Sequence, residues 1–132
     1  MANLYPYIFS EDARKQSEFY AQALNGEVVS VQTFEQAPDV NPELKDKVMH
    51  LTLSAADQIF FMADSVQEPV QLGTQLNLVL EYKTEDEART VFENLSEGGK
   101  ILMPFEKMFW GAMFGRVEDK FGLTWQITTE HE

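Results

Sequence analysis

The chain of 132 residues contains no cysteine. It can therefore form neither a disulfide framework nor a thiolate zinc site, and it has no thiol nucleophile. Long apolar runs are also missing, since none approaches the roughly 20 residues that a membrane-spanning helix needs. The first residues, MANLYPYIF, lack the basic region of a signal peptide and are followed by acidic residues from Glu11. We expect a soluble, cytoplasmic protein.

Basic residues are scarce as well. Ten Lys and Arg stand against 22 Asp and Glu, which gives a formal net charge of −12. Such a charge repels phosphate backbones and anionic lipids at long range, so we expect neither a nucleic-acid nor a membrane partner. A small anionic ligand remains compatible with it, because salt screens charges beyond about 10 Å and one local cation can outweigh them.

Apolar residues, in contrast, are plentiful, at 44% of the chain, and they follow an internal repeat. Residues 11–29 (EDARKQSEFYAQALNGEVV) and 85–102 (EDEARTVFENLSEGGKIL) both run from an acidic start through a helical body to Gly and two apolar residues. Phe19 and Gly26 correspond to Phe92 and Gly99 at the same spacing. The repeat predicts two equivalent modules.

The helix of the second module is marked at both ends. Thr84 and Glu87 have the spacing of a capping box, and Gly98 can adopt the left-handed conformation that ends a helix. The helix is predicted to bury one stripe, formed by Ala88, Val91, Phe92 and Leu95. For the first helix we expect Ser10 as the cap and a buried stripe of Ala13, Phe19, Tyr20 and Ala23.

Around each helix the apolar pattern changes to a period of two, which is typical of strands. The predicted strands span 4–9, 27–34, 47–54 and 59–63 in the first module and 76–82, 100–105, 113–117 and 123–128 in the second. Asp119 and Gly122 suit a type I turn before the last strand. The prediction is an α+β fold, one domain of two βαβββ modules at about 1–66 and 73–132.

The alternation also gives each sheet an apolar and a polar face. The predicted apolar positions are Met49, Leu51, Leu53, Leu76, Leu78, Leu80, Leu123, Trp125 and Ile127. The opposite positions include Val48, His50, Thr52, Asn77, Glu81, Thr124, Gln126 and Thr128. The polar face of an antiparallel sheet is often simply solvated. The alternative is that these polar faces line a binding site.

Several motifs carry a family resemblance. The segments PYIF, EFYAQALNGEVV, HLTL, EGGKILMP and the run W-G-x-x-F-G-x-V-x-D-x-F-G-x-x-W at 110–125 resemble PhnB-like proteins of the vicinal oxygen chelate superfamily, which includes glyoxalase I and bleomycin-resistance proteins. The resemblance covers nearly the whole chain. It implies curved mixed sheets around a cavity that the polar faces line. PhnB-like sequences often carry a demethylubiquinone methyltransferase label, which no motif in this chain supports.

The resemblance also implies positions for a metal. Superfamily members that use one take a His, Glu or Gln from the first and the last strand of each module. In this chain those positions correspond to Tyr5, Phe61, Asn77 and Gln126. Phe cannot ligate, and neutral amide oxygens are weak ligands beside carboxylate or imidazole. We therefore expect no metal and no cofactor, and a cavity lined by Tyr5, Tyr7, His50, Asn77 and Gln126.

Two histidines are present. His131 stands at the C-terminal end and is expected to be exposed. His50 lies within a predicted strand, on the polar face, and histidine is the side chain that ordinarily changes charge near neutral pH. It is a candidate general acid or base. The alternative is a structural, hydrogen-bonded histidine.

The aromatic stretch 108–125 contains both core and site candidates. Trp125 and Phe121 are predicted to belong to the core. Trp110 is predicted to face the cavity, with the core and a partner subunit as alternatives. Arg116 is the best-placed cation for an anionic ligand; the alternative is a salt bridge to Glu118.

The leading functional hypothesis is a metal-free protein that binds a small molecule, with no reaction assigned. One alternative is a metal-dependent lyase, isomerase or dioxygenase that uses His50 and Glu81 as unconventional ligands. Another is a drug-sequestering resistance protein that binds cations, which suits the charge of −12. We also expect a homodimer, because the superfamily commonly pairs modules across subunits and because Phe105, Phe109 and Phe114 exceed what one small core needs.

Overall fold

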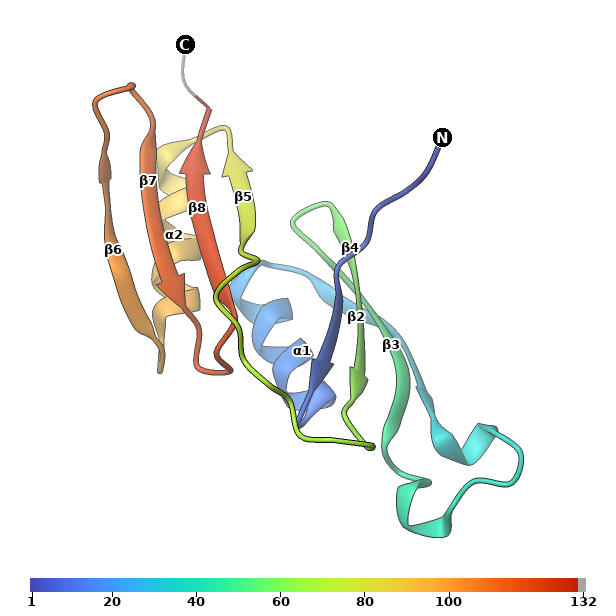
Figure 1. Ribbon diagram of the computed structural model, residues 1–132. Coiled ribbons are helices and arrows are strands. Elements are labelled where there is room, and N and C mark those ends of the chain that lie inside the picture. The colour runs from blue at the N-terminus through green and yellow to red at the C-terminus, as the bar shows by residue number, and fades with distance from the viewer. Residues whose placement is uncertain (131–132) are drawn as a thin grey trace. The chain divides into compact units, whose positions relative to one another are not determined.

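The computed structural model describes residues 1–130, so His131 lies outside the described residues. The chain divides into two compact units, Met1–Gln71 and a second that begins at Leu72. Each unit has the order strand, helix and three strands, which confirms the predicted tandem βαβββ fold (Figure 1). That both modules form one domain stays a prediction.

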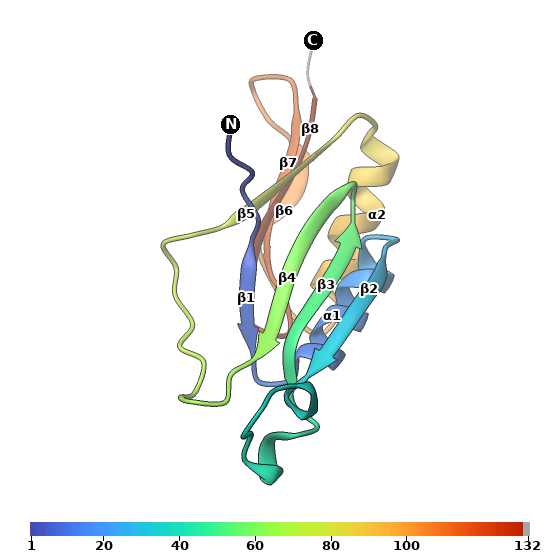
Figure 2. The ribbon, with the colours of Figure 1, turned by 90° about the vertical axis from the view of Figure 1, so that its right-hand side faces the viewer.

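The first unit contains a four-stranded sheet with one helix against one of its faces (Figure 2). Its elements are β1 (Tyr7–Ser10), α1 (Ala13–Ala23), β2 (Glu27–Thr33), β3 (Val48–Ala55) and β4 (Gln58–Asp64), with the 3-10 helices η1 (Phe34–Gln36) and η2 (Pro42–Leu44) between β2 and β3. The strand order is β1-β4-β3-β2. β1 runs parallel to β4, and the other pairs are antiparallel.

The second unit repeats this topology. Its elements are β5 (Leu78–Tyr82), α2 (Glu85–Ser96), β6 (Lys100–Lys107), β7 (Met113–Glu118) and β8 (Thr124–Thr129). The strand order is β5-β8-β7-β6, and again the first strand pairs in parallel with the last. Within residues 1–130, no helix has the length and hydropathy of a membrane span.

Helix α2 follows its sequence pattern. The Thr84 hydroxyl accepts a hydrogen bond from the Glu87 backbone N–H at 3.2 Å, and Gly98 has a φ of 74°. The predicted stripe of four apolar residues is buried. Local signals were sufficient here because cap, stripe and stop lie within one continuous segment.

Helix α1 corrects two expectations. Its cap is Asp12, whose carboxylate accepts a backbone hydrogen bond in the first turn. Ser10 instead donates to the side chain of Gln16, which in turn donates to the Tyr20 hydroxyl at 2.7 Å. This network lets Tyr20 be completely buried, as predicted, while Phe19, which was also expected in the buried stripe, is only half-buried. The apolar spacing could not anticipate a polar network that satisfies a buried phenol.

Two strands begin later than predicted. β1 starts at Tyr7, because Pro6 has no N–H to donate to the ladder, although its carbonyl still accepts from the Phe61 N–H at 2.9 Å. β5 starts at Leu78. Leu76 therefore lies outside the strand and is exposed, so its assignment to the core was wrong.

Strict alternation also fails at two strand ends. Val48 and Thr124 are buried, although the pattern assigned both to the polar face. Their predicted core neighbours Met49 and Leu123 are only half-buried. At the start of β3 the cause is visible: the Val48 N–H donates to the Asp64 carboxylate at 2.7 Å, which holds that residue against the end of β4.

The spacing of Trp, Gly and Asp in 110–125 builds the hairpin between β7 and β8. Buried Asp119 accepts hydrogen bonds from the N–H groups of Phe121 at 2.8 Å and Leu123 at 3.2 Å, and from the Trp125 indole at 2.8 Å. Gly122 has a φ of 93° and its N–H donates to the Asp119 carbonyl at 2.9 Å, which confirms a turn at the predicted residues. Trp125 is fully buried as predicted, whereas Phe121 is half-buried.

Candidate functional site

The face of the first sheet opposite α1, here called the first open face, carries a cluster of aromatic rings. Strand alternation places Tyr7 and Phe9 on this face, because Ile8 and buried Ser10 point to the helix side. Tyr7 is in register with Phe61 of β4, and Phe61 with Thr52 of β3. The members of the cluster are Tyr5, Tyr7, Phe9, His50 and Phe61.

These rings touch one another in a continuous chain. The Tyr7 ring centroid lies 5.1 Å from that of Phe9 and 6.0 Å from that of His50. The Phe61 centroid lies 5.0 Å from His50 and 4.9 Å from Tyr5. Tyr7 and Phe9 are nevertheless 46% and 59% exposed. The cluster can therefore stack against a planar or apolar ligand, or hold a cation over its ring faces.

His50 lies in the middle of this cluster. Its ring contacts are Tyr7 and Phe61, and its imidazole forms no hydrogen bond with any residue of the described range 1–130. The expectation of a structural, hydrogen-bonded histidine is therefore not met within that range. The imidazole is left as a polar group on an otherwise aromatic surface.

The corresponding face of the second sheet, the second open face, carries a polar group of three side chains. The Asn77 amide oxygen accepts hydrogen bonds from Arg116 Nη2 at 3.3 Å and from Gln126 Nε2 at 3.1 Å. Arg116 and Gln126 are cross-strand partners on β7 and β8. Arginine has no acceptor atom, so the Asn77 atom facing it must be the oxygen, and Gln126 must present its NH₂ group to that same oxygen.

Arg116 is the unusual member of this group. Its Nε is enclosed by protein and has no hydrogen-bond partner in the part of the chain that the structure describes. The ion pair found within residues 1–130 joins Arg89 to Glu85 at 2.9 Å. The alternative salt bridge between Arg116 and Glu118 does not form within that range. No carboxylate within the described range forms an ion pair with this guanidinium.

Trp110 lies in the turn between β6 and β7, outside the core. It is 43% exposed and packs edge-on against Phe109, with 4.9 Å between ring centroids, while Phe109 itself is 97% exposed. Trp110 also meets Phe114 edge-on at 6.1 Å. Phe114 alternates with buried Met113 and Gly115, so it belongs to the second open face. The alternative that Trp110 belongs to the core is therefore excluded.

The four positions that correspond to metal ligands in the superfamily form two contacting pairs, one in each unit. The Tyr5 ring lies tilted against that of Phe61, with 4.9 Å between centroids, and Asn77 accepts a hydrogen bond from Gln126 at 3.1 Å. An aromatic ring and neutral amides do not suit a divalent metal. No group of three His, Asp or Glu that could hold a metal occurs among residues 1–130, and this includes His50 and Glu81. The residues present do not fit the metal that the superfamily implies.

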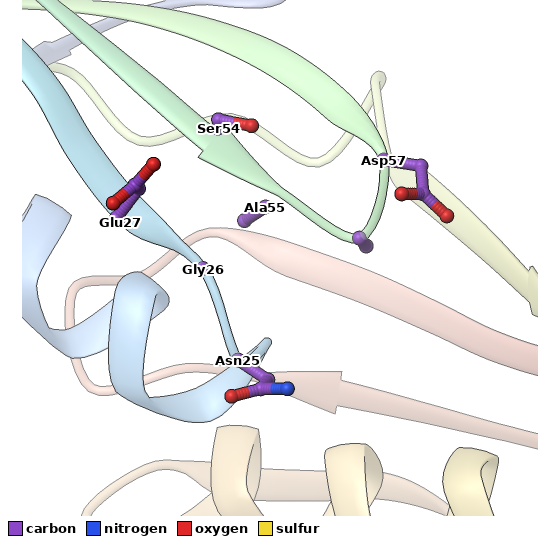
Figure 3. A pocket seen from close by; sticks show the side chains of 7 residues that line it. Asn25, Gly26, Glu27, Ser54, Ala55 and Asp57 are labelled. Carbon is purple, nitrogen blue, oxygen red and sulfur yellow. The ribbon is translucent and has the colours of Figure 1, made fainter.

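A pocket of about 290 Å³ lies elsewhere in the first unit, between the turn after α1 and the β3–β4 hairpin (Figure 3). Its lining residues are Asn25, Gly26, Glu27, Ser54, Ala55, Ala56 and Asp57. Asn25, Ala56 and Asp57 have positive φ angles, so turn geometry shapes it. The Glu27 and Asp57 side chains lie on opposite sides of Ala55 and do not converge (Figure 3). We assign this pocket no function.

Sequence reasoning missed part of the aromatic cluster. It named Tyr5, Tyr7 and His50, but it considered Phe61 only as a metal position and did not name Phe9. The signal was present, since Phe9 follows Tyr7 by two residues and must share its face. The pairing of β1 with β4, which adds Phe61, comes from the parallel register and could not be read locally.

Comparison with known proteins identifies relatives over the whole length. Residues 3–128 match the family model described as 3-demethylubiquinone-9 3-methyltransferase. Protein YjdN of Escherichia coli (strain K12) is 26% identical over 136 residues, covering 94% of this chain and 92% of that protein. The crystal structure of PA1353 from Pseudomonas aeruginosa is 28% identical, with a TM-score of 0.86 and complete coverage of both chains.

A PhnB protein from Bacillus cereus, described as a putative 3-demethylubiquinone-9 3-methyltransferase, is 27% identical with a TM-score of 0.80, covering 98% of this chain and 100% of that one. At the level of fold alone, an enzyme of the glyoxalase/bleomycin resistance protein/dioxygenase family from Burkholderia phytofirmans PsJN matches with a TM-score of 0.65 at 12% identity, covering 95% of each chain. These matches confirm the resemblance inferred from the sequence motifs.

Proposed function

Since the chain belongs to the 3-demethylubiquinone-9 3-methyltransferase family, the PhnB-like branch of the vicinal oxygen chelate superfamily, we propose that it is a metal-free protein that binds a small molecule on the open faces of its sheets. The ligand-contacting residues are Tyr5, Tyr7, His50, Asn77, Trp110, Arg116 and Gln126. Phe9 and Phe61 extend this set within the aromatic cluster. We assign no reaction to the protein.

One observation carries this proposal. The positions where metal-using relatives place ligands hold side chains that contact each other instead, as the Tyr5–Phe61 and Asn77–Gln126 pairs. The same faces keep aromatic and hydrogen-bonding groups that their own helices do not cover. Aromatic walls with a few polar groups are the usual composition of small-molecule sites.

The proposal includes a cytoplasmic location and a homodimer. Both rest on general arguments: the chain lacks cysteine, and large apolar side chains such as Phe109 stay exposed on the single chain.

The first test is elemental analysis of the protein purified without chelators. We expect zinc, nickel, iron and manganese far below one atom per chain, and ligand binding that is unchanged by a chelator. About one tightly bound metal per chain would contradict the proposal. It would support the metal-dependent lyase, isomerase or dioxygenase instead.

The second test maps binding by NMR on the isotope-labelled full chain. A library of planar aromatic fragments should shift backbone amides of β1, β4 and β8. Tyr7→Ala should weaken binding at the first open face by about five- to tenfold, since loss of one aromatic contact costs about 1 to 1.4 kcal/mol. The double variant Trp110→Ala with His50→Ala removes one ring from each open face and should abolish binding of the ligand.

Phe19→Ala is the matched control, because it removes a half-buried ring from the helix side of the same unit. Equal weakening by Phe19→Ala and Tyr7→Ala would show that binding follows general stability and not the open face. Fragments that shift only residues of the helices would place the site elsewhere.

A further inference from the structure

The hydrogen bonds of the second open face leave an excess of donors. Asn77 Oδ1 already accepts two hydrogen bonds, so this oxygen has no lone pair left. Asn77 still has its NH₂ group, Gln126 has one further N–H, and most of the five N–H donors of Arg116 lack a protein acceptor within residues 1–130. The chemical group that completes this arrangement is an acceptor.

The positive charge of Arg116 also favours an acceptor, and specifically an anion. The Arg116 guanidinium is partly buried, its Nε is enclosed and unpartnered, and no carboxylate of the described chain pairs with it. A buried cation without a counter-charge is costly, and an unsatisfied buried polar atom in a native structure calls for an explanation. The other two arginines have ordinary environments, since Arg89 pairs with Glu85 and Arg14 is exposed on α1.

The surroundings of the guanidinium describe the rest of the ligand. In the cross-strand register, Val79 stands beside Gln126, and Met103 stands beside Arg116. Both are exposed apolar side chains, so the polar group is flanked by apolar surface on two sides. Glu81 and Glu118 share this face by alternation, and the whole chain carries −12. This field disfavours a second negative charge on the ligand.

We infer that Arg116, with Asn77 and Gln126, binds the carboxylate of a monoanionic small molecule whose apolar body lies on Val79 and Met103. A guanidinium fork matches the planar carboxylate, and such charge-assisted hydrogen bonds are among the strong ones. This inference rests on the proposed function and names the chemical class of ligand for that site. It excludes cations and phosphate dianions as the preferred ligands.

The test titrates the labelled full chain with four probes that share one ring: benzoate, phenyl phosphate, benzamide and benzylammonium. Benzoate should shift the Nε–H resonance of Arg116 and the backbone amides of Arg116 and Gln126, and it should bind most tightly. Arg116→Gln should weaken benzoate binding by about tenfold or more. Arg116→Lys keeps the charge but loses the guanidinium fork, so its benzoate affinity should lie between those of the wild type and Arg116→Gln.

Arg14→Gln is the control, because it removes the same charge from an exposed helical position outside the site. It should change benzoate affinity by less than about twofold at physiological salt, since solvent screens distant charges. Melting curves of both Arg116 variants verify that they are folded.

Each contrary outcome has a distinct meaning. Equal weakening by Arg14→Gln and Arg116→Gln would overturn the inference in favour of a general charge effect. Benzamide, phenyl phosphate or benzylammonium binding this face as tightly as benzoate would overturn the carboxylate assignment and leave the proposed function standing. Probe shifts confined to the first open face would likewise overturn the inference about Arg116 and leave the proposed function standing. Absence of any shift on either open face with all four probes would overturn both the inference and the proposed function.

Discussion

At the scale of single residues, Asp119 explains the spacing of Asp119, Gly122 and Trp125 in the last hairpin. One carboxylate satisfies two backbone N–H groups of the turn and the indole N–H of Trp125. A buried Trp needs a partner for its N–H, and a tight turn needs acceptors for its inward N–H groups. The motif is therefore mainly a device for closing the last hairpin.

The two tryptophans have opposite environments, which yields a prediction. Trp125 is completely buried, so Trp125→Ala should cost about 3–5 kcal/mol of unfolding free energy. That corresponds to a fall in Tm on the order of 10 °C or more in a chain of this size. Trp110 is 43% exposed, so Trp110→Ala should lower Tm by only a few degrees. Thermal denaturation followed by circular dichroism measures both, and equal losses would place Trp110 in the core after all.

At the scale of elements, α2 packs closely on β7 because Gly115 has no side chain. A Cβ added there would lie 2.6 Å from Phe92 Cε1 and 3.0 Å from Phe105 Cα. The Phe92 and Phe105 rings are themselves 5.5 Å apart between centroids. The absence of a side chain at Gly115 thus allows Phe92 of α2 to contact Phe105 of the edge strand β6.

We therefore expect Gly115→Ala to destabilise the protein by about 1–3 kcal/mol, because the backbone of β6 and the Phe92 ring must both shift. Gly73→Ala is the matched control, since no atom lies within 4 Å of a Cβ at that position. It should leave stability unchanged or raise it slightly. Urea denaturation measures both variants. If Gly115→Ala is neutral, the close approach of α2 to β7 is not as tight as described.

At the scale of the whole molecule, exposed aromatic side chains bear on the expected homodimer. Of the three phenylalanines that suggested a surplus, Phe105 packs against Phe92, Phe114 is half-buried, and Phe109 is 97% exposed. Of these three phenylalanines, only Phe109 is therefore left almost fully exposed to solvent. An exposed aromatic side chain of this kind is typical of interaction surfaces.

We predict that light scattering at micromolar concentration gives twice the chain mass of 15.1 kDa. Phe109→Asp should shift this equilibrium toward the monomer, because burying a carboxylate at an interface is costly. Leu76→Asp introduces the same charge at another exposed apolar position and should leave the mass unchanged. A wild-type protein that is monomeric under these conditions would contradict the expected dimer.

The sequence by itself determined the two βαβββ modules, the cap, stripe and stop of α2, and the turn from Asp119 to Gly122. It also showed that Phe61 cannot ligate a metal. Each of these follows from residues close in the chain or from the chemistry of one side chain, which no fold can change.

The tertiary structure alone decided which distant side chains meet. Arg116 and Gln126 reach Asn77 from 39 and 49 residues away, and Tyr7 meets Phe61 across a parallel pair of strands. Local periodicity specifies the face of an element, whereas partners across strands depend on register, which is set by the packing of the complete sheet.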